Sequence, residues 1–179
     1  AGQNIVRNCM EDEVIQGFMN KTIYDEIIPT LTLPKDELES FAHSVTERFK
    51  NPFIDHALLA ISLNSTSKWK ARVMPSFLGY VKNTNTLPKC ITASFAFYIA
   101  FYKGIRLEDS GLIGKRGEEE YTIHDDRDIL EFYDAHKNDS NAELAHAVCS
   151  NVNFWGQDLT EIAGFESAIT EYLDKIDQE

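Results

Sequence analysis

Ile91-Thr-Ala-Ser-Phe-Ala-Phe-Tyr-Ile-Ala-Phe-Tyr102 is the longest apolar stretch of the chain. It leaves no polar stripe at helical spacing, which predicts a helix that is buried on every face. The stretch is shorter than the ~20 residues that a membrane-spanning helix needs. We therefore expect it to be the central helix around which the rest of a globular domain packs.

Helical periodicity extends from this central helix in both directions. Apolar residues recur at the spacing of one helix face through most of the chain. The tetrapeptide Thr-Leu-Pro-Lys occurs at residues 32–35 and again at 86–89, before two such patterns, and proline suits the first turn of a helix. The periodicity predicts further helices over residues 6–28, 36–49 and 54–63, from residue 67 onward with a kink or a break at Pro75, and over 126–136, 140–150 and 165–176.

Glycine and charged residues replace this periodicity at residues 104–120. Gly111, Gly114 and Gly117 with the adjacent charges predict a long exposed loop. No sustained alternation of apolar and polar residues and no Asn-Gly turn marks a strand. In the helix over 36–49, the residues expected to face inward are Leu38, Phe41, Val45 and Phe49. The predicted fold is an all-α helical bundle of roughly six to eight helices, a single domain over residues 1–179.

The charge balance is acidic, with a formal net charge of −12 over 179 residues. Such a chain repels phosphate backbones and anionic lipid surfaces, so we expect neither nucleic acid nor a membrane as its partner. Its three cysteines are far apart and odd in number, which favours reduced thiols and a cytoplasmic location. None of its five histidines has the His-Glu-x-x-His spacing of a zinc site, and we expect no metal.

Positive charge is concentrated in the segment Asn64-Ser-Thr-Ser-Lys-Trp-Lys-Ala-Arg72. Lys68 and Arg72 share a face if the segment is a regular helix, so both charges can converge on one anion together with the first-turn amides. Asn64 and the serine after it can hydrogen-bond to ligand hydroxyls. Lys70 is two residues from Lys68 and faces elsewhere. The structural alternative is that Asn64 or the serine caps the helix and the cations face solvent.

Other short motifs indicate no second chemistry. Ser65-x-x-Lys68 matches an acyl-enzyme signature, but its companion motifs Ser-Asp-Asn and Lys-Thr-Gly are absent. Neither a Gly-x-Gly-x-x-Gly turn after a strand nor a phosphate-binding loop occurs, so the sequence predicts no nucleotide site. His124-Asp125-Asp126 lies where a helix begins, and we expect capping there rather than cation binding.

A series of short blocks occurs in a fixed order: Glu-Asp-Glu-Val at 11–14, Ile-Ile-Pro-Thr-Leu at 27–31, Leu-Pro-Lys at 33–35, Arg-Phe-Lys-Asn-Pro-Phe-Ile at 48–54, Ser-Leu-Asn-Ser at 62–65, Ser-Lys at 67–68, Arg-Val-Met-Pro-Ser at 72–76, Ala-Phe-Tyr-Lys-Gly at 100–104 and Trp-Gly-Gln-Asp-Leu at 155–159. Together, from about Glu11 to Leu173, they resemble the C-terminal domain of the polyol-specific long-chain dehydrogenases, the mannitol dehydrogenase family. Within it, the chain is most similar to the branch that interconverts tagaturonate and altronate in hexuronate breakdown.

The resemblance implies a two-domain enzyme, with an N-terminal Rossmann domain that binds NAD and a helical C-terminal domain on the side of the sugar-acid substrate. The family's proton-transfer motif, Lys-x4-Asn-x2-His, is absent here and lies in the family shortly before the segment similar to residues 2–13. We therefore expect a piece of the enzyme that starts just after the catalytic base, contains no catalytic residue and is inactive alone. Its expected partner is the N-terminal Rossmann domain of the same polypeptide, packed on an apolar face formed by helix 6–28 and by residues 95–101.

The resemblance also bears on the substrate site. The mannitol dehydrogenase branch contacts its substrate through an arginine and a lysine at fixed distances after an Asn-Pro pair. Counted from Pro52, the lysine falls on Lys68 and the arginine falls on Ala60, which argues against mannitol as the substrate. Fructuronate reductase, mannitol dehydrogenase and a non-catalytic helical module that docks an acidic partner remain as alternatives. The expected substrate-binding residues are Lys68, Asn64, Arg72 and Lys70.

Overall fold

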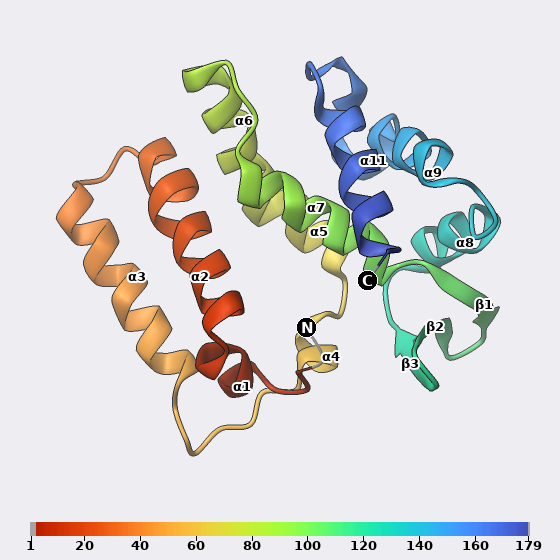
Figure 1. The fold of residues 1–179 in the computed structure, drawn as a ribbon, viewed down its shortest axis with the longest axis horizontal. Coiled ribbons are helices and arrows are strands. Elements are labelled where there is room, and N and C mark those ends of the chain that lie inside the picture. The colour runs from red at the N-terminus through yellow and green to blue at the C-terminus, as the bar shows by residue number, and fades with distance from the viewer. Residues whose placement is uncertain (1–2, 179) are drawn as a thin grey trace. The chain divides into compact units, whose positions relative to one another are not determined.

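The structure of the protein, a computed structural model, describes residues 3–178 (Figure 1). The chain forms two compact units. The first contains Ala1–Ser62 and Pro75–Ile91, and the second contains Leu63–Met74 and Thr92–Glu179. The chain therefore passes from one unit to the other three times, and each unit is described by itself.

The first unit is helical. A break at Asp12 divides the helix predicted over residues 6–28, because the Asp12 backbone is extended and its side chain accepts hydrogen bonds from the amides of Val14 (3.0 Å) and Ile15 (3.1 Å) as an N-cap. A single long helix was therefore the wrong prediction for this segment. The elements of this unit are α1 (Val6–Glu11), α2 (Glu13–Lys21), a π-helical turn η1 (Thr22–Ile27), a 3-10 turn η2 (Ile28–Thr30), α3 (Lys35–Phe49), α4 (Leu58–Ile61) and most of α6 (Met74–Thr84).

Few apolar side chains of the first unit are buried. Helix α2 contains no buried residue, although it is amphipathic. On α3, Phe41 and Phe49 were predicted to face inward but are 66% and 40% exposed. The helix predicted over residues 54–63 is reduced to the short α4. The core of this unit is consequently small for its apolar content.

Both Thr-Leu-Pro-Lys segments precede helices, as predicted. Helix α3 begins at Lys35 and α7 (Lys89–Phe101) begins at Lys89, in each case directly after the proline. The first turn of α7 is closed by a residue distant in sequence. The Glu26 carboxylate accepts hydrogen bonds from the amides of Cys90 (2.8 Å) and Ile91 (2.7 Å).

Helix α7 supplies the core of the second unit. Phe95, Ile99 and Tyr102 are fully buried, which largely confirms the predicted burial of this helix, although Phe97 is half exposed. The Phe95 ring lies 4.5 Å from Trp69 and 5.1 Å from Trp155, measured between ring centroids. The other helices of the second unit are α5 (Ser65–Lys68), a π-helical turn η3 (Trp69–Val73), α8 (Arg127–Ala135), α9 (Asn141–Cys149), α10 (Val152–Trp155), a 3-10 turn η4 (Leu159–Glu161) and α11 (Phe165–Ile176).

A three-stranded antiparallel sheet occupies the segment predicted to be a loop, so that prediction was wrong. Strands β1 (Gly104–Glu108), β2 (Gly111–Arg116) and β3 (Glu119–Ile123) lie in the order β1-β2-β3, with α8 beside the sheet (Figure 1). Two glycines allow the close pairing. A Cβ on Gly114 would lie 2.5 Å from the Tyr121 ring, and one on Gly111 would lie 2.5 Å from the Ile123 carbonyl oxygen. The predicted class is nevertheless confirmed, because the described chain is mostly helical.

Candidate substrate-binding turn

The segment predicted to bind an anion begins with a left-handed residue. Asn64 has φ 55° and ψ 46°, a conformation that asparagine tolerates better than most residues. Its carbonyl oxygen accepts hydrogen bonds from the Ser67 hydroxyl (3.1 Å) and the Lys68 amide (3.2 Å), which closes the first turn of α5. The Asn64 side chain does not cap the helix. The structural alternative named Asn64 or the serine after it as the cap, and its Asn64 half is therefore wrong.

The cap comes instead from Asp125, in the loop between β3 and α8. Its Oδ2 atom accepts hydrogen bonds from the Thr66 amide (3.3 Å) and the Thr66 hydroxyl (3.0 Å). The Asn64 amide adds a hydrogen bond to the His124 carbonyl oxygen (3.1 Å). The His124-Asp125-Asp126 segment was expected to cap the helix that it precedes, and that prediction was wrong, because the Asp125 carboxylate bonds to the start of α5 instead. Asp126 precedes α8 and makes no side-chain cap bond to it.

Buried hydroxyl groups extend this contact into the core. Tyr102 donates a hydrogen bond to Asp125, the Thr66 and Tyr98 hydroxyls lie 2.8 Å apart, and the Tyr133 hydroxyl donates to that of Tyr98 (3.0 Å). Burial raises the pKa of Tyr98 and of Tyr102 well above the usual value, and the Asp125 carboxylate raises that of Tyr102 further. Both phenols therefore remain protonated donors over the physiological pH range.

The four predicted substrate-binding residues occupy this turn and its continuation. Asn64, Lys68 and Lys70 are half-buried, and Arg72 is exposed. Lys70 lies against the turn at Gly156, with its Nζ atom 3.8 Å from the position that a Cβ on that glycine would occupy. Between Lys70 and Lys68, Trp69 is buried and its indole N–H donates to the Ser94 hydroxyl (3.4 Å).

The helix that carries these cations is not regular. Residues Trp69–Val73 form a π-helical turn, so the α-helical spacing assumed for Lys68 and Arg72 does not apply. Proline 75 explains the widening, because it has no N–H to donate and its ring would clash with the carbonyl of the residue four positions earlier. The π-helical turn runs directly into α6 (Met74–Thr84), whose first turn contains Pro75, so the predicted kink or break at this proline stays a prediction. Turns of the π-helical type are frequent at functional sites.

Sequence reasoning missed Asp125, Thr66 and Tyr102 as parts of this arrangement. Thr66 and Asp125 are 59 positions apart, so no motif spacing relates them. The available signal was an acidic residue directly before a predicted helix, which reads as a local cap. Only the placement of the loop between β3 and α8 beside the start of α5, where the Asn64 amide bonds to the His124 carbonyl oxygen, directs that carboxylate to another helix.

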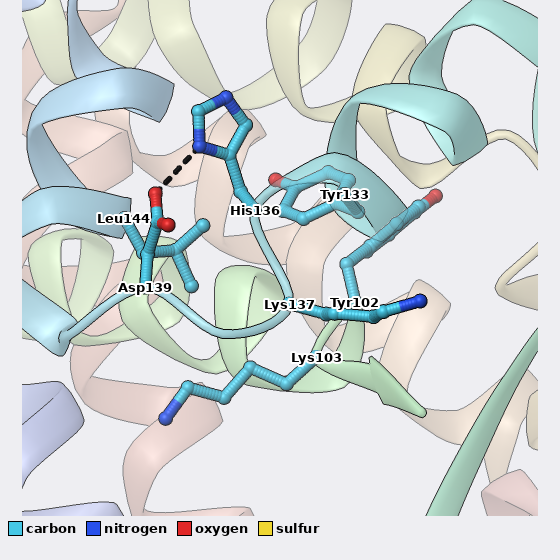
Figure 2. Close-up of a pocket in the computed structure, with 7 residues that line it drawn as sticks. All are labelled: Tyr102, Lys103, Tyr133, His136, Lys137, Asp139 and Leu144. Carbon is cyan, nitrogen blue, oxygen red and sulfur yellow. Dashed lines mark hydrogen bonds and ion pairs between the residues drawn. The ribbon is translucent and has the colours of Figure 1, made fainter. Parts of the chain in front are cut away.

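A hollow of the surface, of about 150 Å³, lies beside this network and is lined by Tyr102, Tyr133, Leu144, Lys103, His136, Lys137 and Asp139. Figure 2 shows the His136 ring turned toward Asp139, with 2.6 Å between Nδ1 and Oδ2. Lys103 is paired with Asp177 (2.8 Å), and Lys137 is paired with Asp134 (2.9 Å). Because the cations here are matched by carboxylates, this hollow offers little net charge to an anion.

Within residues 3–178, no group of three His, Cys, Asp or Glu side chains is arranged to hold a metal ion. The same residues include no helix that is long and apolar enough to span a membrane. Gly111 and Gly114 belong to an antiparallel sheet in which their missing side chains make room for β3. They do not form the strand, glycine-rich turn and helix of a dinucleotide site, so these two glycines are not a dinucleotide-binding turn.

The matching family model is the mannitol dehydrogenase C-terminal domain, over residues 1–177. The chain belongs to this family. Among solved structures, Pseudomonas fluorescens mannitol 2-dehydrogenase, in a ternary complex with NAD and D-mannitol, shares the fold with a TM-score of 0.81 at 18% sequence identity, over 98% of this chain and 33% of that one.

Proteins with similar amino-acid sequences include altronate oxidoreductases. The chain is 42% identical over 182 residues to the altronate oxidoreductase of Enterobacter sp. (strain 638) and 41% identical to that of Escherichia coli O7:K1. Both alignments cover 98% of this chain and 36% of the relative. The chain thus spans about a third of the length of these proteins.

Proposed function

We propose that this chain is the substrate-side domain of an NAD-dependent altronate oxidoreductase, which interconverts tagaturonate and altronate by hydride transfer. The observation that carries the proposal is the identity of 42% to an altronate oxidoreductase over 98% of the chain. The turn of residues 64–72 supplies the matching chemistry, because it places two half-buried lysines beside a polar asparagine. A partly desolvated ammonium forms strong, charge-assisted hydrogen bonds with a carboxylate.

In this proposal Lys68 binds the carboxylate of the sugar acid, and Asn64 hydrogen-bonds to its hydroxyls. Lys70 and Arg72 contribute positive potential, Lys70 from its place against Gly156 and Arg72 from the exposed side. Ala60, at the position of the mannitol-branch arginine, lies exposed in α4 and has no polar group to offer. A sugar acid held by a cation is therefore favoured over a neutral polyol.

The cofactor is assigned to the remainder of the enzyme. When it is bound, the reduced cofactor would donate a hydride to tagaturonate and the oxidised cofactor would accept one from altronate, and Gly111 and Gly114 do not form a dinucleotide-binding turn. An N-terminal Rossmann domain of the same polypeptide would hold it. For the isolated chain we therefore expect no oxidation of NADH with tagaturonate when absorbance is followed at 340 nm. Robust turnover by residues 1–179 alone would overturn this division of roles.

The exposed apolar side chains of the first unit are explained by the same partner. Phe53 is 92% exposed and Val14 is 81% exposed, and α2 has no buried residue although it carries an amphipathic pattern. The Rossmann domain is the expected cover, since about two thirds of each relative lies outside the matched region. Of the two segments predicted to form this face, residues 95–101 are mostly buried, with Phe95 fully so, but they include Phe97, which is 51% exposed, so that part of the prediction holds only at Phe97.

Lys68→Ala in the full-length enzyme tests the proposed site. We expect kcat/KM for tagaturonate to fall by ~10²-fold or more, as when a donor to a charged oxygen is lost. Lys82→Ala, which removes the same charge from an exposed position on α6, is the matched control and should leave kinetics unchanged. Unchanged kinetics for Lys68→Ala would remove this residue from the site. Faster turnover of fructuronate or mannitol than of tagaturonate by the wild type would favour a sister enzyme instead.

A further inference from the structure

The first turn of α5 is capped by the carboxylate of Asp125, which is 59 residues away from Thr66 in the chain. We propose that Asp125 is a positioning residue that holds the turn of Asn64 and Lys68 in its substrate-binding conformation, acting through Thr66. This inference rests on the proposed function of that turn. It adds a residue that neither motif spacing nor the charge pattern of residues 64–72 indicates.

The turn lacks a cap of its own. The Asn64 backbone is in the left-handed conformation, and the Asn64 side chain makes no cap hydrogen bond to the helix. The N–H groups of the first turn therefore need another acceptor. The Asp125 carboxylate is that acceptor, since it accepts one hydrogen bond from the Thr66 amide and another from the Thr66 hydroxyl. A negative charge at this end of a helix is favourable as well, because the unpaired amides carry partial positive charge.

Asp125 is itself held in place from several directions. Its Oδ2 atom accepts from Tyr102 and from both donors of Thr66, and its Oδ1 atom accepts from the Asp126 amide (2.8 Å). Tyr102 and Thr66 are buried, and the high pKa of Tyr102 keeps its proton on the phenol. The carboxylate therefore cannot turn toward solvent without leaving buried donors unpaired.

Thr66, which Asp125 holds in place, lies close in the chain to the proposed substrate contacts Asn64 and Lys68. Lys68 lies two residues after Thr66 in the same four-residue helix, and its amide bonds to the Asn64 carbonyl oxygen. A displaced Thr66 would therefore move both proposed substrate contacts together. A misplacement of about 1 Å is enough to cost ~10²-fold in rate when groups must be aligned with a substrate.

A double-mutant cycle in the full-length enzyme tests this role. Asp125→Asn keeps the shape but removes the charge and one acceptor, and we expect kcat/KM for tagaturonate to fall by 10- to 100-fold. In a Lys68→Ala background the same substitution should lower kcat/KM by a clearly smaller factor than in the wild type, because Asn64 is then the one proposed substrate contact of the pair that Asp125 still positions. Asp128→Asn, an equal charge change at an exposed position in the first turn of α8, is the control and should have no effect in either background.

Hydrogen exchange provides a readout that does not depend on substrate. Asp125→Asn should speed exchange of the amides of residues 65–69 by at least tenfold, and Asp128→Asn should not. Equal losses of activity in the wild-type and Lys68→Ala backgrounds, or unchanged exchange in this segment, would overturn the proposal. If Asp125→Asn does not fold, Thr66→Val takes its place in the cycle and Thr66→Ser, which retains the hydroxyl, must restore activity. If Lys68→Ala alone is fully active, the proposed role of Lys68 in substrate binding fails, while the exchange experiment still decides whether Asp125 holds the turn.

Discussion

Replacement of Glu26 by alanine should loosen the first turn of the central helix α7. Glu26 lies in the π-helical turn η1 and is only 6% exposed. One carboxylate oxygen accepts from the Cys90 amide (2.8 Å) and the other from the Ile91 amide (2.7 Å). Alanine leaves both amides without this acceptor, and that of Ile91 is buried.

The loss of local stability expected for Glu26→Ala can be worked out from the two hydrogen bonds that Glu26 accepts. A hydrogen bond to a charged group contributes ~1.5–3 kcal/mol, and loss of an N-cap costs ~0.5–2 kcal/mol. Water can reach the half-buried Cys90 end, so the two bonds do not add in full. We expect about 2–4 kcal/mol, which corresponds to roughly 30- to 1000-fold faster exchange at these amides because 1.36 kcal/mol is one factor of ten.

Hydrogen exchange measured by mass spectrometry on peptides that cover residues 89–95 is the direct assay. Asp25→Ala removes an equal charge from an exposed neighbour on the same turn and is the control. Glu26→Gln keeps one acceptor oxygen and should give an intermediate rate. Wild-type exchange rates in Glu26→Ala, or an equal acceleration in Asp25→Ala, would refute the assignment of Glu26 as the cap of α7.

Two further predictions concern packing and thiol reactivity. Gly114→Ala should lower the free energy of unfolding by ~1–3 kcal/mol through overpacking, because the new Cβ would lie 2.5 Å from the Tyr121 ring. Gly17→Ala, at a helix position with nothing within 4 Å of the new Cβ, should instead raise it by ~0.5–1 kcal/mol. Denaturant unfolding compares the two variants, and equal effects would contradict the packing argument. Burial, and to a smaller extent the Glu166 carboxylate, raises the pKa of the Cys149 thiol to about 12. Iodoacetamide at pH 8 should therefore modify this thiol far more slowly in the folded protein than in the denatured protein. Similar modification rates in the two states would show that the thiol is accessible in the folded protein.

Helix positions were largely predictable from local pattern. The predicted helices over 36–49, 126–136, 140–150 and 165–176 correspond to α3, α8, α9 and α11, because an amphipathic repeat and its caps are encoded within one segment. The capping box of Ser140 and Glu143 at the start of α9 is such a local signal.

The sheet was missed for a physical reason. The first four residues of β2 are buried without alternation, since both faces of that part of the strand are covered. The turn before β3 uses Gly117 at φ 59° without the Asn-Gly pair that marks many hairpins. Glycine and charge at residues 104–120 therefore resemble a loop when they are read without their partners. Arg106 instead bonds to Glu120 through both terminal nitrogens (2.8 and 2.7 Å) across the sheet.

The sequence by itself determined that the chain is mostly helical, that the apolar segment of residues 91–102 lies in the core, and that cations gather at residues 64–72. These are properties of neighbouring residues, and short-range periodicity and composition are sufficient to encode them. Only the tertiary structure decided which carboxylates cap α5 and α7. Asp125 and Glu26 reach those helices from 59 and 64 residues away in the chain. A hydrogen bond requires atoms about 3 Å apart, and packing rather than sequence spacing brings such distant groups within that distance.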